Sequence, residues 1–590
     1  MITNKTNRKF GFLLEHQKTR KGPIVFNKSP MGKTACLNSY RVLILFLIAM
    51  NCLLIPTSTF GQNFFSKYFK DQQKYSVTVD PTQVQGTLQE GRVYLTEAEV
   101  ISMALVHNLD INVERHGYLL DQWTVDQHKG IYDPTLNLGF GWDRNKIPSS
   151  NVLQGGTSIT DVLTSYNAGY LQNFSTGTSF ELNFESMRNR TTNLYSRVVP
   201  AIDSNFKVIF RQNLLEGFGR VTPDYQIEIS LNNRESNEQK FKQNASEIII
   251  LVLNAYWELQ FALQDIEVKT KSLQLANTIL DQNRSRLEAG MAARLEVVEA
   301  DAEVASRREE LIRSQFNYRS IQDQLIKLIT NYQDPRKFPG EIVPARQIYT
   351  PSPISNSFEK LQTIAWELRP EIQQAEFAIL NKELNLAASR NHLKPTLDLV
   401  AGYRQFGLGG NQRTLDFSQG IGNAQILAII PGGIGDSFSQ LSSGDFYGYT
   451  LGLNLELPIF NTDALAKNAK AQLEMDRSFL QKQSILQTIS LEIRDALTSI
   501  EGNEARLEAG QEAVRFATER LKGEEARFKI GIGTTRQLIE AQRDLLQTTS
   551  ILLRARVDLI KSHHLLDRAL GQTFTKNNIL LSETLKTNIN

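Results

Sequence analysis

The sequence contains two related copies of one long unit, and this duplication constrains the fold more than any other feature. The segment Asp133–Leu138 returns as Lys394–Leu399, 261 residues later, and Arg286–Gly290 returns as Arg527–Gly531, 241 residues later. The unit is therefore over 200 residues long, with an insertion or deletion of about 20 residues inside it, and it is far longer than the repeats of solenoid proteins. A duplication of this size predicts two copies of one structural role around a pseudo-symmetry axis.

The first 61 residues predict a secretory signal peptide with an unusually long basic region. An apolar run over 42–55 precedes the small residues Thr59 and Gly61, which fit a cleavage site after Gly61. The run is too short to span a bilayer comfortably, although a signal anchor is the alternative. A start at Met31 would give a leader of ordinary length.

Composition excludes several functional classes. Both cysteines, Cys36 and Cys52, lie in the leader, so the mature chain would have no disulfide, thiolate metal site or cysteine nucleophile. The net charge is +2 and nothing beyond residue 41 is strongly basic, which argues against a nucleic-acid partner. Histidines and carboxylates lack the spacing of a metal or catalytic site, so we predict no metal, no cofactor and no enzymatic activity.

Each copy contains alternating stretches that are typical of β-strands. In Tyr447–Leu457, tyrosine and leucine alternate with small or polar residues. About ten such residues suit a membrane-barrel strand with its apolar face toward lipid, although a soluble sheet with one buried face alternates in the same way. We expect the lipid-facing residues to include Leu136, Leu138, Phe140, Trp142, Tyr447, Tyr449, Leu451 and Leu453.

Long helices follow the strands. Neither glycine nor proline occurs between Asp224 and Ala289, and no proline follows Ile459. Gly290 and Gly531 favour sharp turns, after which the chain returns as a shorter helix. Each long helix is ~100 Å long. The summed length of the return helix and the first helix of each copy (Thr96–Ile131 in copy one) matches this length, so these two helices can lie end to end along the long one. We expect the long helices at 222–289 and 462–530 and the return helices at 294–332 and 536–570.

Four clear strands per chain cannot close a barrel, because membrane barrels begin at eight strands and an open sheet in lipid leaves backbone groups unpaired. Two chains would give eight strands and a filled interior, whereas three would give twelve and a lumen. Inward-facing charges at Lys207, Arg211, Asp398 and Glu456 fit a wet lumen. Two further alternating stretches within 165–187 leave two alternatives open: an additional hairpin in the barrel, or one standing above it.

The order and spacing of these features resemble the TolC-like outer-membrane efflux protein family. The resemblance covers Tyr94–Gly571 and rests on Ala104 with Asn108, on Arg369-Pro370-Glu371, on the Pro-Thr-Leu strand starts and on the two glycine turns. It implies an α + β membrane protein in the outer membrane: a homotrimer with a shared, twelve-stranded β-barrel continued by an α-helical coiled-coil tube in the periplasm. It also implies docking to a periplasmic adaptor (membrane fusion) protein and to an inner-membrane pump.

The resemblance further assigns roles to the two turns, which would form the periplasmic tip. Adaptor docking is expected at Arg286, Gly290, Met291, Arg527, Gly531 and Gly533, and a gate with selectivity at Glu296, Glu299, Gln537 and Glu540. Because Gln537 stands where relatives commonly have an acidic residue, we expect one ring of Glu540 carboxylates, three by symmetry, that favours cations. The alternative is that these are solvated charges on helices.

The expected organisation is a signal peptide (1–61), a linker (62–93), repeat one (94–334, strands about 135–213), a linker (335–356), repeat two (357–571, strands about 396–457) and a tail (572–590). The expected function is a trimeric outer-membrane exit duct of a tripartite efflux or type I secretion system that conducts substrates passively. The alternative is a periplasmic coiled-coil adaptor, or a structural protein that spans the envelope without a pore.

Overall fold

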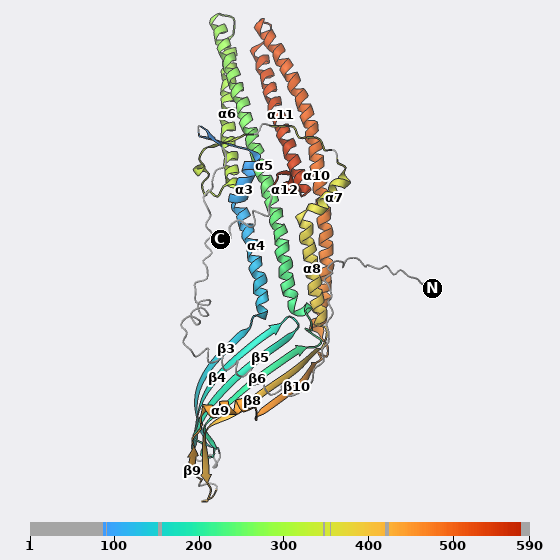
Figure 1. Cartoon of the computed structure of the whole chain (residues 1–590). Helices are drawn as coiled ribbons and strands as arrows, with labels where there is room; N and C mark the ends of the chain where they lie inside the picture. The colour runs from blue at the N-terminus through green and yellow to red at the C-terminus, as the bar shows by residue number, and fades with distance from the viewer. Residues whose placement is uncertain are drawn as a thin grey trace, which may run out of the picture. The chain divides into compact units, whose positions relative to one another are not determined.

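A computed structural model describes residues 87–89, 91–150, 156–345, 348–354, 356–418, 420 and 424–579. The expected signal peptide, both cysteines and the last eleven residues lie outside the described part. Two helices of 68 residues each, α5 (Val221–Glu288) and α10 (Thr462–Lys529), occupy the positions expected for the long helices. Their return helices, α6 (Arg294–Ile329) and α11 (Thr535–Ala569), pack back along them as two hairpins (Figure 1).

The first helix of each copy is broken about a third of the way along it, so the prediction of one helix over Thr96–Ile131 was wrong. In copy one α3 (Glu97–His107) and α4 (Leu109–Lys129) meet at Asn108, and in copy two α7 (Phe358–Leu368) and α8 (Pro370–Asn391) meet at Arg369; both junction residues are extended. Proline disfavours helical backbone in the residue before it, which explains the break at Arg369. Asn108 instead caps α4, since its Oδ1 accepts from the next helix's first N–H groups.

The two junction residues also bind the end of the return helix. Asn108 donates from Nδ2 to the carbonyl of Leu328 at 2.8 Å. Arg369 donates from Nη1 to the carbonyls of Arg568 and Ala569 at 3.3 and 3.4 Å. Leu328 and Ala569 differ by the repeat offset of 241, so one contact recurs in both copies. It satisfies carbonyls that the C-terminus of a helix leaves without intrahelical partners.

Two clusters of buried apolar residues surround these junctions, one in each copy, and together they are called the belt. Trp257 and Tyr256 on α5 pack against Leu325 and Ile329 of α6, and copy two has a similar cluster around Ile493 of α10. One segment of α5 is long and apolar enough to cross a membrane by composition, but 56% of it is buried against the rest of the chain, as part of this core. A small sheet completes the belt: β1 (Thr87–Gln89), β2 (Arg92–Leu95) and β7 (Glu341–Pro344), in that order.

A larger antiparallel sheet lies at the ends of α4, α5, α8 and α10 that are opposite the hairpin turns (Figure 1). Its strands are β3 (Thr135–Pro148), β4 (Ser158–Phe174), β5 (Thr178–Thr191), β6 (Val198–Asn213), β8 (Thr396–Asp416), β9 (Gln425–Ile430) and β10 (Tyr447–Glu456). The order is β10-β8-β6-β5-β4-β3, and β9 pairs with the outer part of β8. The stretches whose place the sequence left open are β4 and β5, in the middle of the sheet. Without β9, which lies off this path, the sheet has six strands, so the count of twelve strands in a trimer, which rested on four per chain, does not follow.

The register sorts the side chains of all six strands onto two faces. One row across the sheet contains only apolar or aromatic side chains: Leu136, Tyr170, Leu182, Val208, Tyr403 and Tyr449. The next row contains only polar side chains or glycine: Asn137, Gly169, Asn183, Lys207, Arg404 and Gly448. All eight residues expected to face lipid share the apolar face, where their exposure ranges from 56% to 80%.

A short helix, α9 (Ile434–Ser443), lies on the apolar face over glycines of β8. A Cβ atom at Gly407 would stand 2.0 Å from the carbonyl oxygen of Ser437, and one at Gly409 would stand 2.2 Å from that of Gly433. The ring of Phe438 stacks on Phe184 of β5 with centroids 5.7 Å apart. These glycines therefore allow a helix to lie directly on the sheet.

Substitution of Arg369 tests the contribution of the junction to stability. Its buried guanidinium pairs with Glu371 at 2.9 Å and with Glu492 at 2.8 Å. We expect Arg369→Met to lower the free energy of unfolding by about 2–4 kcal/mol, because it leaves partly buried carboxylates and helix-end carbonyls without a donor. Thermal unfolding followed by the helical circular dichroism signal measures the change. The matched control is Arg336→Met, whose side chain is 87% exposed; an equal effect of both variants would contradict the role of the junction.

Candidate functional site

The two hairpin turns, expected to be the functional tips, end their long helices in the same way. Gly290 and Gly531 adopt φ of +74° and +79°, which side-chain-bearing residues rarely adopt. The N–H of Met291 donates to the carbonyl of Arg286 at 2.8 Å, and that of Ile532 donates to Arg527 at 3.1 Å. This is the glycine-dependent Schellman ending of a helix, so the repeated glycines are required by the turn itself.

The second turn is tighter and better capped than the first. A Cβ atom at Gly533 would stand 2.9 Å from the backbone nitrogen of Phe528. Thr534 then caps α11 in a capping box, in which Gln537 accepts from the Thr534 N–H at 3.2 Å. In copy one the equivalent positions are Ala293, which has no side-chain cap, and Glu296. Gln537 therefore stabilises the start of its own helix, whereas Glu296 is free to act elsewhere.

The two turns contact each other through buried polar groups. The hydroxyl of Thr535 lies 2.9 Å from Oε2 of Glu296 and 3.2 Å from Oδ1 of Asn283, and it can donate to one of them at a time. Thr535 and Asn283 are almost fully buried. The guanidinium carbon of Arg286 also lies 4.8 Å from the ring centre of Phe528, a cation–π contact. The copy-one tip thus binds the copy-two tip within one chain.

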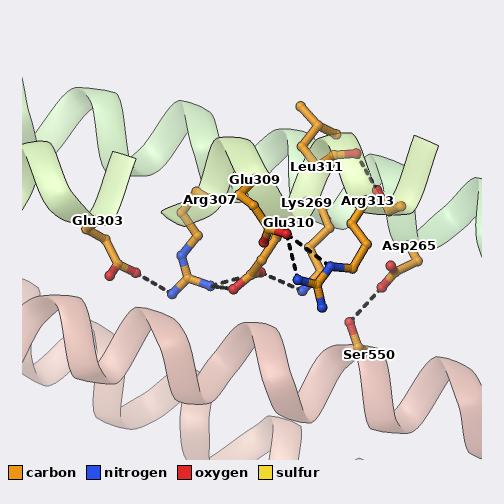
Figure 2. A network of polar contacts seen from close by, with 10 residues as sticks. Asp265, Lys269, Glu303, Arg307, Glu309, Glu310, Leu311, Arg313 and Ser550 are labelled. Atoms are coloured by element: carbon orange, nitrogen blue, oxygen red, sulfur yellow. Dashed lines mark hydrogen bonds and ion pairs between the residues drawn. The ribbon is translucent and has the colours of Figure 1, made fainter. Parts of the chain in front are cut away.

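Farther from the tips, ion pairs continue the link between the hairpins. Glu303 of α6 binds Arg307 at 2.5 Å and Arg543 of α11 at 2.6 Å, and the Arg307 side chain is 5% exposed. Figure 2 shows the pair Glu303–Arg307 together with Glu310, whose carboxylate binds Arg307 and also pairs with Lys269 of α5 at 2.8 Å. Burial would raise the pKa of Glu310, but the hydrogen bond from Lys269 and the nearby positive charges outweigh it, so that pKa is lowered.

A second cross-hairpin cluster lies nearer the belt. Glu258 of α5 pairs with Arg554 at 2.8 Å and also with Lys561, both on α11. Burial of Glu258 would raise its pKa, but hydrogen bonds from Lys561 and Arg554 outweigh burial and lower that pKa. A carboxylate held charged in this way contributes stability above its ordinary pKa and loses it only as the pH falls below that value.

The expected gate positions have different surroundings. Glu296 is half-buried against Thr535, and Glu299 is half-buried on the same helix. Gln537 is exposed and caps α11, whereas Glu540 is exposed and pairs with Arg536 at 3.2 Å. The structure therefore brings only Glu296 of these four into contact with the other hairpin. Among the described residues, no cluster of histidine, cysteine, aspartate or glutamate could hold a metal ion.

Sequence reasoning named Arg286 and Glu296 but missed Asn283 and Thr535, which also join the tips. Asn283 was the best signal, because it continues the apolar spacing of Leu273, Ala276 and Leu280 in α5 with a polar side chain. A buried amide in such a stripe requires a partner. Its partner Thr535 lies 252 residues away, so no local pattern could identify it.

Comparisons with known proteins identify the family and the fold of the chain. A family model described as outer membrane efflux protein matches residues 215–331 and 363–572. The probable efflux pump outer membrane protein TtgC of Pseudomonas putida is 23% identical over 60% of this chain and 66% of its own length, just under two thirds. The outer membrane efflux protein BepC of Brucella suis is 20% identical over 82% of this chain and 88% of its own length.

Solved structures of outer-membrane channels share the fold. The channel OprN has a TM-score of 0.57 at 16% identity and covers 81% of this chain and 90% of its own. The CmeC channel of Campylobacter jejuni has the same TM-score and identity over 83% and 89%. At this identity the likeness concerns the fold alone. It confirms the predicted fold class, an α + β membrane protein with a helical tube and a β-barrel.

Removal of one hydroxyl tests the contact between the tips. We expect Thr535→Val to speed amide hydrogen exchange at residues 535–541 about tenfold, because it removes the hydroxyl that donates to either the buried Asn283 or the half-buried Glu296. Hydrogen exchange followed by mass spectrometry measures this change. Thr548→Val is the matched control on the same helix, since the Thr548 hydroxyl binds only carbonyls of its own helix. Equal exchange in wild type and Thr535→Val would contradict a stabilising contact.

Proposed function

Because the chain belongs to the outer membrane efflux protein family and is located in the outer membrane, we propose that it forms a trimeric exit duct. The family model and the relatives confirm the resemblance that was inferred from the duplicated motifs. The duct would conduct substrates passively from a periplasmic adaptor and an inner-membrane pump to the outside. The relatives named above are outer-membrane components of efflux systems, which supports the direction of transport.

The observation that carries this proposal is the pair of open edges of the large sheet. Among the strands that the structure describes, β3 pairs only with β4, and β10 pairs only with β8. Each unpaired backbone group in lipid costs several kcal/mol, so a sheet with an apolar outer face must close. The two edge strands, β3 and β10, run antiparallel to each other. Each strand on the path is antiparallel to the next, and the chain direction therefore reverses five times between them. The β10 edge of one copy therefore suits the β3 edge of the next, which supports a barrel shared among copies.

The tips suit a protein partner in the periplasm. Met291, Ile530 and Ile532 are 69%, 72% and 65% exposed at the turns. Exposed apolar side chains gathered at one place mark interaction surfaces. We assign adaptor docking to these turns, including the positions expected from the sequence: Arg286, Gly290, Met291, Arg527, Gly531 and Gly533.

Protein extracted from outer membranes in detergent tests the duct. Native mass spectrometry should give three copies that dissociate on heating, and planar bilayers should show discrete conductance steps. A monomer without conductance would contradict the proposal. A protein that does not sediment with outer membranes would favour the alternative, a periplasmic adaptor without a pore.

We further propose that Glu540 forms a ring of three carboxylates that favours cations at the tip. Glu540 is exposed, and among the described residues it forms an ion pair only with Arg536, one helical turn away. Glu540→Gln should lower the cation-to-anion permeability ratio about twofold or more, because it removes charge where the tube narrows. Reversal potentials in a salt gradient measure the ratio. Glu508→Gln, an exposed carboxylate far from the tip on α10, is the control. An unchanged ratio in Glu540→Gln leaves the gate acids as solvated helix charges.

A further inference from the structure

Two of the six sheet strands have no helix of their own. Four strands connect directly to helices: β3 follows α4, β6 precedes α5, β8 follows α8, and β10 precedes α10. These helices pack side by side in the order α4, α5, α8, α10, which is the order of their strands. The hairpin β4–β5 is inserted between β3 and β6, above the place where α4 and α5 touch.

The inner turn of this hairpin is anchored between the two helices. Gly177 accepts from the N–H of Asn213 at 3.2 Å, and Thr176 accepts from the N–H of Gly219 at 3.3 Å. A Cβ atom at Gly177 would stand 2.2 Å from the carbonyl oxygen of Gly217, where β6 leads into α5. On the other side, Gln172 donates to the carbonyl of Tyr132, in the short 3-10 turn Gly130–Tyr132 that follows α4. The hairpin therefore begins level with the other strands rather than above them.

The tilt of the six strands is that of a closed membrane barrel. A row that starts at Thr135, the inner end of β3, reaches Thr450 in β10. The inner end of β10 is Glu456, six residues farther along the strand. Six residues correspond to a stagger of ~20 Å along the strand direction, and five strand spacings correspond to ~24 Å across the sheet. The ratio of these two lengths is the tangent of the tilt, which is therefore ~40°. Membrane barrels have tilts of about 35–45°.

The strand count also matches the width of the helical part. Packed helices lie about 8–10 Å apart, so four of them occupy ~32–40 Å of the wall. A strand tilted by ~40° occupies ~6 Å of the circumference. Six strands therefore occupy ~38 Å and match the helices, whereas four would occupy only ~25 Å.

We propose that β4 and β5 are wall strands, so that three copies close an eighteen-stranded barrel as wide as the twelve-helix tube below it. This inference rests on the proposed trimer. Barrels of 16–18 strands enclose an aqueous channel. Its inner face carries Asp161, Glu181 and Glu185 from the inserted hairpin, on the same side as Lys207 and Asp398. The barrel then imposes no size limit beyond that of the helical tube, and solutes that pass the tube pass the exit.

Disulfide formation tests whether the hairpin is in the wall. Cys36 and Cys52 are the natural cysteines and would be replaced by serine. In the first variant, Gly141→Cys is combined with Ser165→Cys; these positions are register partners on β3 and β4, and a Cβ at Gly141 would stand 2.5 Å from the Ser165 hydroxyl. In the second variant, Gly141→Cys is combined with Asp203→Cys or Asn205→Cys on β6. Copper-catalysed oxidation in native outer membranes should link the first pair alone, because three strand spacings, ~14 Å, separate β3 from β6. A linked second pair, or an unlinked first pair, would overturn the proposal.

Electron cryomicroscopy of the full chain in detergent separates this inference from the proposed trimer. Three copies with eighteen strands support both. Three copies with twelve strands overturn the inference and leave the trimer standing. A different number of copies overturns the trimer and the total of eighteen, whereas the disulfide result still decides whether each chain contributes six wall strands.

Discussion

The side chain at each helix junction, Asn108 or Arg369, is the contact on which the rest of the helical structure depends. One helix of 68 residues can pack against two shorter helices only if the gap between them does not leave helix ends unsatisfied inside the belt. Asn108 satisfies the start of α4 and the end of α6 together. Arg369 binds the end of α11 and adds a positive charge where the helix dipole favours one. In both copies the junction side chain thus binds the end of the return helix, through a neutral amide in copy one and a guanidinium in copy two.

Much of this fold could be predicted from local sequence patterns. The absence of glycine and proline between Asp224 and Ala289 gave the length of α5, and the period of two in Tyr447–Leu457 gave the faces of β10. The break at Asn108 could not be predicted in this way, because asparagine is tolerated inside helices and its partner Leu328 is distant in sequence. The place of β4 and β5 was equally out of reach, since alternation indicates which face a residue joins but not which strand lies beside it.

For the candidate site, the duplication located both turns, and their glycines have the conformation that the turn requires. The chemistry between the turns was not predictable, because Thr535 and Glu296 are 239 residues apart. Their contact also shows that the copies are not interchangeable: the third position of α11 caps its own helix through Gln537, while the same position of α6 reaches across to the other hairpin. Position within a repeat therefore does not define a role when the neighbouring copy supplies the partner.

Among the described helices, only α5 and α10 run through the belt, since α3, α6, α7 and α11 end there and α4 and α8 begin there. Any flexing of the tips against the barrel must therefore bend these two rods themselves. They differ in stiffness: α5 has no glycine, whereas α10 has Gly502, Gly510 and Gly523, all between the belt and the tip. At two of the three, Gly502 and Gly523, an added Cβ atom would meet no heavy atom of this chain within 4 Å. We therefore expect α10 to bend more easily than α5 between the belt and the tip, so that a displacement of the tips would be accommodated mainly in copy two.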